Sequence, residues 1–390
     1  MEMLFKLDHQ KCFPVGTVDA CGSSTLSLSL DDEIDETIEF LKILGKSIDL
    51  IDSKYENMMK CLGLSREDLF YSIPTSVMRS RLKDTLELTR VSLEDTDNKA
   101  YLVTYLTIKR FLRGLSRARI DKMVLQNLIG ETENVNVSSR LKAFMPPAGT
   151  DLLKKSTYSM SKTATGRLTV IAGPQILTLN SDARCIFKSS FSEGKVLQID
   201  LVAAEPNIAL KMFDKSIEPP DGDVYQHLSN VVFDQKISRD LCKLITLCVL
   251  YGQSSKNIEK KLPSNLRSQT VIRKTRDFFN VSYLEKMLYQ NFKSKNLRNA
   301  LGRPINLGPD DARLCLNYFL QSSAAEISVL MFSEWCKKNA SQSKPIYVIH
   351  DALIVDCDER LSRKLLKDRV IDLSIGGWTL KAKVTQVSNI

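Results

Sequence analysis

The chain has 390 residues, of which 43% are hydrophobic, and it carries a net charge of +9. These values favour a globular protein of two or three domains and exclude a disordered chain. No segment approaches the roughly eighteen consecutive apolar residues of a membrane span, and the N-terminus lacks the apolar region of a signal peptide. The nine cysteines show no zinc-binding spacing, which favours reduced thiols. We therefore expect a cytoplasmic protein with no membrane partner.

Residues 1–150 are predicted to be mainly helical. The first helix should begin at Asp31 and Asp32, because apolar residues follow at helical spacing: Ile34, Ile38, Leu41 and Leu44. A second helix is predicted over Ala100–Leu115. The stretch 100–120 contains basic residues and no acid, namely Lys109, Arg110, Arg113, Arg117 and Arg119. Pro146-Pro147 then interrupts the helical pattern and predicts a domain boundary near residue 150.

Short strands and turns are predicted from Ser161 to Ala209, and helices from 225 to 340. One strand is Val196-Leu197-Gln198-Ile199-Asp200, an apolar run that ends in a carboxylate. On the helix predicted over 238–252, four residues recur every four positions and form one stripe: Arg239, Lys243, Leu247 and Tyr251. Arg and Lys on such a stripe suit phosphate oxygens, although an amphipathic helix with two solvated cations gives the same pattern.

The segment 253–303 is strongly basic, with twelve Lys and Arg against three acidic residues. It also contains five aromatic residues: Phe278, Phe279, Tyr283, Tyr289 and Phe292. Cations mixed with aromatic rings suit a nucleic-acid backbone and unstacked bases. A solvated helical face whose aromatic residues lie in the core would have the same composition.

The last fifty residues contain a second apolar strand that ends in a carboxylate. They predict a strand over 345–349, the turn His350-Asp351, a strand over 352–356, a helix over 359–367 and a strand over 379–387. Two strand-end carboxylates can together hold two Mg²⁺ ions about 3.5–4 Å apart, as nucleotidyl transfer requires. Either aspartate alone is also typical of an ordinary turn.

In order and content these motifs resemble the DNA polymerase I family, also called family A polymerases. Thr165-Gly166-Arg167-Leu168 is similar to that family's Thr-Gly-Arg-Leu segment. Asp200 and Glu205 keep the spacing of its motif A, and His350-Asp351 resembles its motif C. The stripe from Arg239 to Tyr251-Gly252 resembles motif B. A family helix beside the template and primer is matched by Arg313, Asn317 and Gln321.

The resemblance covers about Thr165 to Asp356 and implies an α+β right-hand architecture with a helical thumb, an antiparallel-sheet palm and helical fingers. The thumb would lie in 1–150, the palm in 151–224 and 313–390, and the fingers in 225–312. The implied activity is template-directed addition of dNTPs to a primer 3′-hydroxyl, with two Mg²⁺ ions or with Mn²⁺ in their place. The implied partners are primer–template DNA and dNTPs. We expect no proofreading domain within 1–150, and this small core would suit a virus or a mobile element.

The resemblance also implies roles for individual residues. Asp200 and Asp351 would be the metal ligands, and Lys243 would assist departure of pyrophosphate. Nucleotide contacts would come from Arg239, Lys243, Leu247, Tyr251, Glu205 and Tyr225, with Glu205 and Tyr251 excluding a ribose 2′-hydroxyl. DNA contacts would come from Arg167, Arg313, Asn317, Gln321, His350, Arg110, Arg113, Arg117 and Arg119.

Three positions depart from the family pattern. Ala352 stands where motif C has a third, acidic residue, Leu247 replaces an aromatic residue, and Tyr225 replaces a histidine. Two alternatives therefore remain beside a DNA polymerase. A single-subunit RNA polymerase also has His-Asp followed by a small residue, although the bulky Glu205 would obstruct ribonucleotides. A non-catalytic nucleic-acid-binding relative would tolerate Ala352, although it would not need both aspartates.

Overall fold

The computed structural model describes residues 3–7, 14–19, 25–27, 30–46, 61, 84–85, 87–213, 223–253, 255–260, 262 and 266–387. The chain divides into two compact units. The first comprises Met1–Leu106 and Gly302–Asn306, and the second comprises Thr107–Leu301 and Leu307–Ile390. Among the described residues, no helix is both long enough and apolar enough to cross a bilayer. The described cysteines form no disulfide with one another.

The first unit begins with a sheet of three strands, which the prediction of a mainly helical 1–150 did not include. Strands β1 (Met3–Leu7), β2 (Pro14–Asp19) and β3 (Thr25–Ser27) pair antiparallel in that order. Helix α1 (Leu30–Ile43) begins one residue before Asp31, so the two predicted capping aspartates lie in its first turn. Helix α5 (Thr96–Arg113) confirms the second predicted helix and begins four residues earlier.

An aromatic cluster joins α1 to α5 in the first unit. Phe40 of α1 lies against two rings of α5, with centroids 6.1 Å from Tyr101 and 5.3 Å from Tyr105. Both tyrosines are almost fully buried. The Tyr101 hydroxyl accepts a hydrogen bond from Nη1 of Arg303 at 3.0 Å, and Asn306 donates to the carbonyl of Ile43. These bonds explain why the short segment Gly302–Asn306 belongs to this unit.

The second unit is built on a five-stranded antiparallel sheet in the order β11-β12-β8-β10-β9. The strands are β8 (Lys195–Leu201), β9 (Ser343–Ile349), β10 (Ala352–Cys357), β11 (Val370–Ile375) and β12 (Trp378–Gln386). Helix α15 (Glu359–Asp368) lies between β10 and β11 in the chain. Four of the strands and the helix confirm the sequence prediction. Strand β11 was missed, although Gly376-Gly377, both with positive φ, joins it to β12 as a hairpin.

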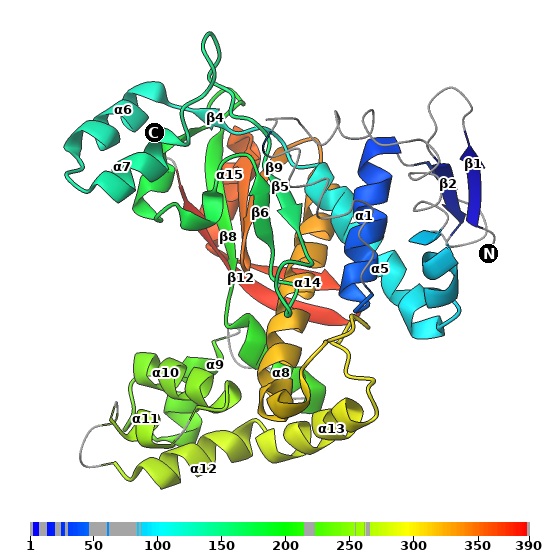
Figure 1. The fold of residues 1–390 in the computed structure, drawn as a ribbon. Coiled ribbons are helices and arrows are strands. Elements are labelled where there is room, and N and C mark those ends of the chain that lie inside the picture. Colours follow the sequence, from blue (N-terminus) through cyan, green and yellow to red (C-terminus); the bar gives the residue numbers. More distant parts are fainter. Residues whose placement is uncertain are drawn as a thin grey trace. The chain divides into compact units, whose positions relative to one another are not determined.

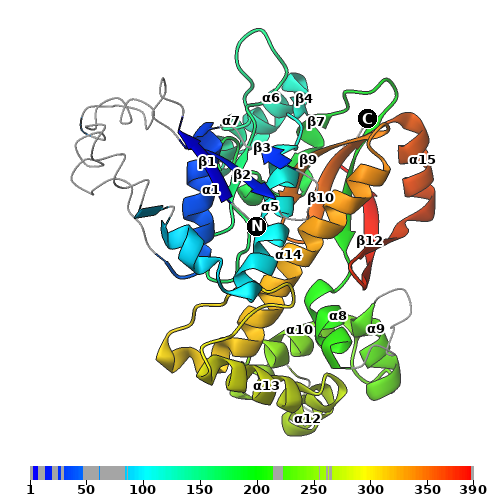
Figure 2. The same cartoon turned by 90° about the vertical axis from the view of Figure 1, so that its right-hand side faces the viewer.

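Strand β8 occupies the middle of the sheet, far in sequence from both of its neighbours. Its apolar residues Val196, Leu197 and Ile199 are fully buried. The long helix α14 (Cys315–Lys338) packs against β9, β11 and α8 (Ala204–Phe213), as Figures 1 and 2 show. Because α14 is buried along most of its length, its Glu326 is also buried and accepts a hydrogen bond from Asn299 at 2.8 Å.

Helices follow one another between β8 and β9, as the sequence predicted for 225–340. Helix α8 comes first, so the prediction of strands and turns as far as Ala209 was wrong from Ala204 onward. In the described residues it is followed by α9 (Val224–His227), a π-helical turn (Leu228–Val232), α10 (Arg239–Leu250), α11 (Ser255–Glu259), α12 (Ser268–Phe278), α13 (Val281–Lys293), a 3₁₀ turn (Pro309–Leu314) and α14. Before β8 lie α6 (Lys122–Glu131), α7 (Val135–Lys142) and the strand pairs β4–β7 (Arg119–Ile120, Phe187–Lys188) and β5–β6 (Thr157–Ser159, Thr169–Ala172). In the described second unit, Pro146 and Pro147 lie outside these elements.

Candidate active site

Two aspartates from distant parts of the sequence meet at the ends of neighbouring inner strands of the sheet. Asp200 lies near the end of β8, and Asp351 lies in the two-residue turn between β9 and β10. Antiparallel pairing aligns Asp200 with Ala352, and the Leu201 amide donates to the Asp351 carbonyl at 3.0 Å. His350 adopts a left-handed φ of 53° in this turn, a conformation that costs a non-glycine residue about 1 kcal/mol or more.

The surroundings of the Asp200 carboxyl group disfavour its charged form. Burial raises its pKa to about 6, and the neighbouring charge of Asp351 contributes further. A hydrogen bond from Gln198 and the positive charges of Arg184 and Lys243 oppose this rise. Gln198 is fixed in turn, because Nη1 of Arg184 donates to its Oε1 at 2.7 Å. Two carboxylates close together in a partly buried site are stabilised by a nearby cation.

Helix α10 presents the predicted stripe. Its N-cap Ser238 accepts a hydrogen bond from the Leu241 amide at 3.3 Å, which fixes where the helix begins. The opposite face, including Cys242, Ile245 and Val249, is buried. Arg239, Lys243, Leu247 and Tyr251 remain partly or fully exposed and line one cavity. The spacing therefore places these four side chains together, as the helical period requires.

Arg239 already has a partner. Its Nε donates to Oδ2 of Asp223, the N-cap of α9, at 2.7 Å, and this bond raises the pKa of the guanidinium. The guanidinium carbon also lies 5.7 Å from the centroid of the Tyr225 ring. Burial and the nearby Glu205 carboxylate raise the pKa of Tyr225 above its usual range. Asp223 and Tyr225 thus orient the guanidinium before any ligand arrives.

Glu205 connects three separate segments. It lies in the first turn of α8, where the helix dipole favours an anion. Its Oε1 accepts from Nη2 of Arg167 at 2.8 Å, and its Oε2 accepts a short hydrogen bond from the Tyr251 hydroxyl. Burial and this carboxylate raise the pKa of Tyr251. The Glu205 side chain is only 13% exposed, so the carboxylate and the phenol form a fixed wall.

A cavity of about 450 Å³ brings most of the predicted residues together. Its lining includes Arg167, Asp200, Glu205, Tyr225, Arg239, Lys243, Leu247, Tyr251, Gln321, His350 and Asp351. Carboxylates from the sheet and cations from α10 therefore face the same space. An arrangement of this kind can bind a polyanion through the cations while the carboxylates hold divalent ions.

Other predicted residues lie elsewhere. Arg313 lines a second cavity of about 550 Å³ rather than the first. Asn317 is not in the lining but accepts a hydrogen bond from Nε2 of Gln321 at 2.5 Å. Arg117 donates to the backbone carbonyls of Leu152 and Leu153.

The remaining basic residues of the 100–120 stretch also lie outside the first cavity. Arg119 forms an ion pair with Asp151 at 3.0 Å. Arg110 is exposed and Arg113 is half-buried at the end of α5. Arg117 and Arg119 are thus already engaged within the protein, which the basic pattern of the sequence did not reveal.

Sequence reasoning missed three polar residues at the site. Gln198 precedes Asp200 by two positions on β8, so strand alternation places both on one face, and its polarity inside an apolar run was the available signal. Arg184 carried no such signal, because only the fold brings it to Gln198. Lys383 of β12 is the partner of Asp200 in the sheet register and lines the cavity. Asp200 therefore has a lysine on one neighbouring strand and Ala352 on the other.

The residues present fit divalent cations. Among the described residues, no group of three or more His, Cys, Asp and Glu side chains is arranged to hold a metal ion. The site offers two carboxylates, and Ala352 supplies no third one. Mg²⁺ commonly binds through one or two carboxylates and completes its shell with water and substrate phosphates. The stressed Asp200 carboxyl group and the facing cations suit that mode.

Comparison with solved structures shows that the fold is similar to a DNA polymerase domain. The match is the POL domain of Pol1 from M. smegmatis in complex with DNA primer-template and dNTP, with a TM-score of 0.50 and 15% sequence identity. It covers 91% of this chain and 64% of that one, so this chain spans less than two thirds of the matched protein. No family model matches the sequence, and no curated protein matches it. At this identity the likeness concerns the fold.

Proposed function

We propose that the chain is a template-directed DNA polymerase that adds dNTPs to a primer 3′-hydroxyl and does not proofread. One observation carries the proposal: the Asp200–Asp351 pair and the α10 stripe, including Arg239 and Lys243, line the same cavity. Under this proposal the five-stranded sheet belongs to the palm (151–224 and 313–390), the helices of 225–312 form the fingers, and residues 1–150 contain the thumb. Similarity to a DNA polymerase domain supports this assignment at the level of the fold.

Asp200 and Asp351 would hold two Mg²⁺ ions, or Mn²⁺ in their place. Bound there, these ions would lower the pKa of the primer hydroxyl and neutralise charge on the leaving oxygen. Arg239 would bind the triphosphate through Nη2, while Asp223 accepts from its Nε and Asp240 accepts from its Nη1 at 3.3 Å. The primer hydroxyl would lose its proton to water as its oxygen bonds to the α-phosphorus. As the α–β bridge breaks, Lys243 would donate a proton to the departing pyrophosphate.

Glu205 and Tyr251 would select the sugar. The hydrogen bonds to the Glu205 carboxylate hold it beside Tyr251, where it would leave no space for a ribose 2′-hydroxyl. Tyr225 and Leu247 would complete the nucleotide contacts. Arg167, Gln321 and His350 line the same cavity and would contact the primer–template duplex, with Asn317 orienting Gln321. Arg313, Arg110 and Arg113 would contact DNA outside it, whereas Arg117 is held by the carbonyls of Leu152 and Leu153.

A primer-extension assay tests the proposal. Purified protein is given a primed DNA template, Mg²⁺, and either dNTPs or NTPs. We expect extension with dNTPs and little or none with NTPs. Efficient extension with NTPs alone would instead identify a single-subunit RNA polymerase, and absence of extension with both would refute the proposal.

A second candidate function is a non-catalytic nucleic-acid-binding protein. Ala352 favours it, because Asp200 then has no third carboxylate on the neighbouring strand. Isothermal titration with Mg²⁺ separates the two candidates without measuring turnover. A catalytic centre should bind Mg²⁺ in the presence of a non-hydrolysable dNTP, and Asp351→Asn should abolish that binding. A binding protein would retain DNA affinity with no such Mg²⁺ dependence.

A further inference from the structure

Strand β12 presents a lysine to the cavity that contains Asp200 and Asp351. Its residues Ala382 and Val384 are buried, so strand alternation directs Lys381 and Lys383 to the opposite face of the sheet. Lys383 is exposed and lines the cavity, whereas Lys381 is absent from the lining. Neither lysine has a role in the proposed function.

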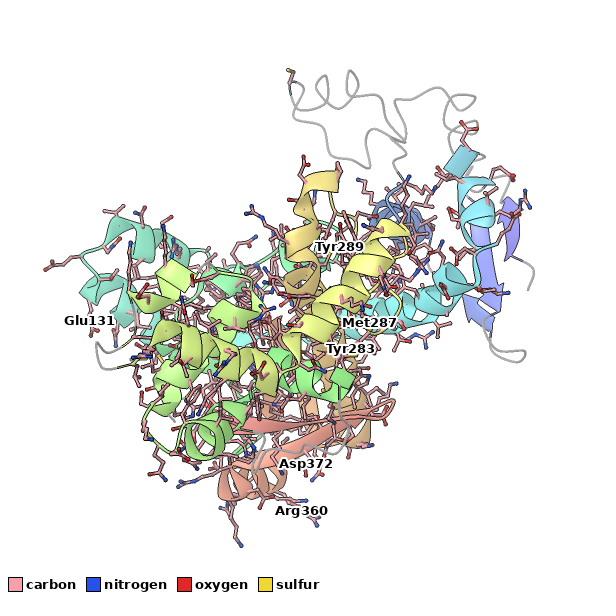
Figure 3. The ribbon with its side chains drawn as sticks, turned by 90° about the horizontal axis from the view of Figure 1, so that it is seen from below. Glu131, Tyr283, Met287, Tyr289, Arg360 and Asp372 are labelled. Atoms are coloured by element: carbon pink, nitrogen blue, oxygen red, sulfur yellow. The ribbon has the colours of Figure 1, made fainter. Side chains whose placement is uncertain are left out.

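The two lysines differ in what they already bind. The Lys381 ammonium lies 3.2 Å from Oδ1 of Asp372, a residue of β11 that Figure 3 labels. The partner of Lys383 on β11 is Val370, which offers no charge. Among the residues that the structure describes, none forms a hydrogen bond or an ion pair with the Lys383 ammonium. Within that part of the chain, Lys383 is thus available to a ligand, whereas Lys381 is already paired.

The register of the sheet places Lys383 on one particular side of the carboxylate pair. Strand β8 lies between β12 and β10, so Lys383, Asp200 and Ala352 follow one another across three strands. Neighbouring strands lie about 5 Å apart, so the three Cα atoms span about 10 Å. The turn His350-Asp351 leads into β10 and therefore lies on one side of Asp200. Lys383 lies on the other side.

Strand β12 also follows the chain past the end of β8. Strand β8 ends at Leu201, and the residues from there to Ala204 line the cavity. The Val202 amide donates to the Lys381 carbonyl at 2.8 Å, so the backbone of β12 stays beside this stretch. Lys383 therefore stands on a strand that is fixed to the cavity wall on both sides of Asp200.

A triphosphate in this cavity would find only part of its charge matched by α10. Lys243 is available there, but Nε and Nη1 of Arg239 are already bonded to Asp223 and Asp240. Metal ions would neutralise the oxygens that face the two aspartates. An ammonium group has three donors and no acceptor, so Lys383 can bond further phosphate oxygens from the sheet side of the cavity.

We propose that Lys383 binds the phosphates of the incoming dNTP that leave as pyrophosphate, an inference that rests on the proposed polymerase function. In-line transfer places the attacking and leaving oxygens on opposite sides of the α-phosphorus. The primer would approach from the side of His350, which is proposed to contact the duplex, so the leaving phosphates would extend toward Lys383. Lys383 would keep its own proton and stabilise the pyrophosphate by charge, since Lys243 supplies the proton.

Isothermal titration tests this inference without turnover. Wild-type protein and the Lys383→Gln variant, both in saturating Mg²⁺, are titrated with inorganic pyrophosphate and with a non-hydrolysable dNTP. Lys383→Gln should raise the Kd for both probes about 10-fold or more, as expected for loss of a hydrogen bond between charged groups. Lys383→Arg keeps the charge and should retain most of the affinity. Saturating Mg²⁺ keeps any change in metal affinity out of the comparison.

Lys381 supplies a matched control. Lys381→Gln removes the same charge from the same face of β12 and should leave both Kd values unchanged. Fluorescence anisotropy should show wild-type affinity of Lys383→Gln for a labelled primer–template. The inference is overturned if Lys383→Gln binds pyrophosphate as the wild type does, if Lys381→Gln weakens it equally, or if Lys383→Gln loses affinity for DNA alone. Primer extension by the wild type reports separately on the polymerase proposal, because neither titration requires turnover.

Discussion

The main cavity has two walls that place charge differently. The sheet wall carries Asp200 and Asp351, and the helix wall is the stripe of α10 that contains Arg239 and Lys243. The sheet wall fixes Asp200 and Asp351 through backbone pairing in the middle of the sheet, and it places like charges together in a partly buried site. The helix wall carries cations on exposed positions of α10, and it gives Arg239 a carboxylate partner in advance. The sheet wall is therefore electrostatically incomplete without a cation, whereas the helix wall is already balanced at Arg239. We expect substitutions in the sheet wall to have the larger effects.

The largest effect should come from removing a carboxylate of the sheet wall. Asp200→Asn should lower kcat for dNTP addition about 10³-fold or more, because several kcal/mol of metal-mediated stabilisation are lost. In metal-free buffer the same variant should unfold at an equal or higher temperature than the wild type, since a buried charge beside Asp351 disappears. Extension assays and calorimetry measure the two effects. Loss of both activity and stability would show that Asp200 is structural.

On the helix wall, Lys243→Ala should lower kcat about 10²- to 10⁴-fold, as expected for loss of a general acid. Lys243→Arg keeps the charge but is a poor proton donor, so it should retain the KM for dNTP while kcat stays low. Single-turnover kinetics provide the measurement. If Lys243→Arg restored kcat, Lys243 would act through its charge alone and not as a proton donor. The two walls would then differ only in their charge.

Glu205 lies between the two walls, and its substitution should change selectivity more than rate. Glu205→Ala should reduce discrimination against ribonucleotides about 10²-fold, because the space beside Tyr251 opens. Glu205→Gln keeps the volume and should retain most of the discrimination. The ratio of kcat/KM for dNTP and NTP measures this effect. Equal effects of the two variants would assign selectivity to charge rather than to shape.

The smallest effect should come from Gln198, which acts through Asp200. Gln198→Leu should raise the Mg²⁺ concentration needed for half-maximal extension about 10-fold, as for other groups that orient a metal ligand. Titration of Mg²⁺ binding should show the same shift without turnover. Gln226→Leu, at an exposed position of α9, is the control and should change neither value. An unchanged Mg²⁺ requirement in Gln198→Leu would show that Gln198 does not position Asp200.

The sequence predicted the site residues whose positions follow from a helical or strand repeat. It missed the site residues that only distant parts of the chain bring into place. The α10 stripe and the strand-end aspartates follow from helical and strand repeats, and the structure brings both into one cavity. Strand alternation could have placed Gln198 beside Asp200. Arg184 and Lys383 could not be placed, because a separate 3₁₀ turn (Asp182–Ile186) and the register of β12 bring them to Asp200.

The N-terminal strands were also missed, and the basic run at 109–119 suggested more free cations than the fold leaves. Strands β1, β2 and β3 are short, with little room for an alternating pattern to accumulate. Arg117 and Arg119 bond to groups more than thirty positions away in the chain. A run of basic residues in the sequence shows how many cations a segment carries. Only the tertiary structure decides which of them bond to groups within the protein.

The central position of β8 has a consequence for synthesis of the chain. About 150 residues separate β8 from β10, and β12 comes later still, so both edges of β8 stay open while the ribosome makes the intervening helices. At typical elongation rates that interval lasts about 10–30 s. A nascent or truncated chain therefore carries an unpaired apolar strand, so it is prone to aggregate, and it lacks the assembled carboxylate pair until its last strands arrive.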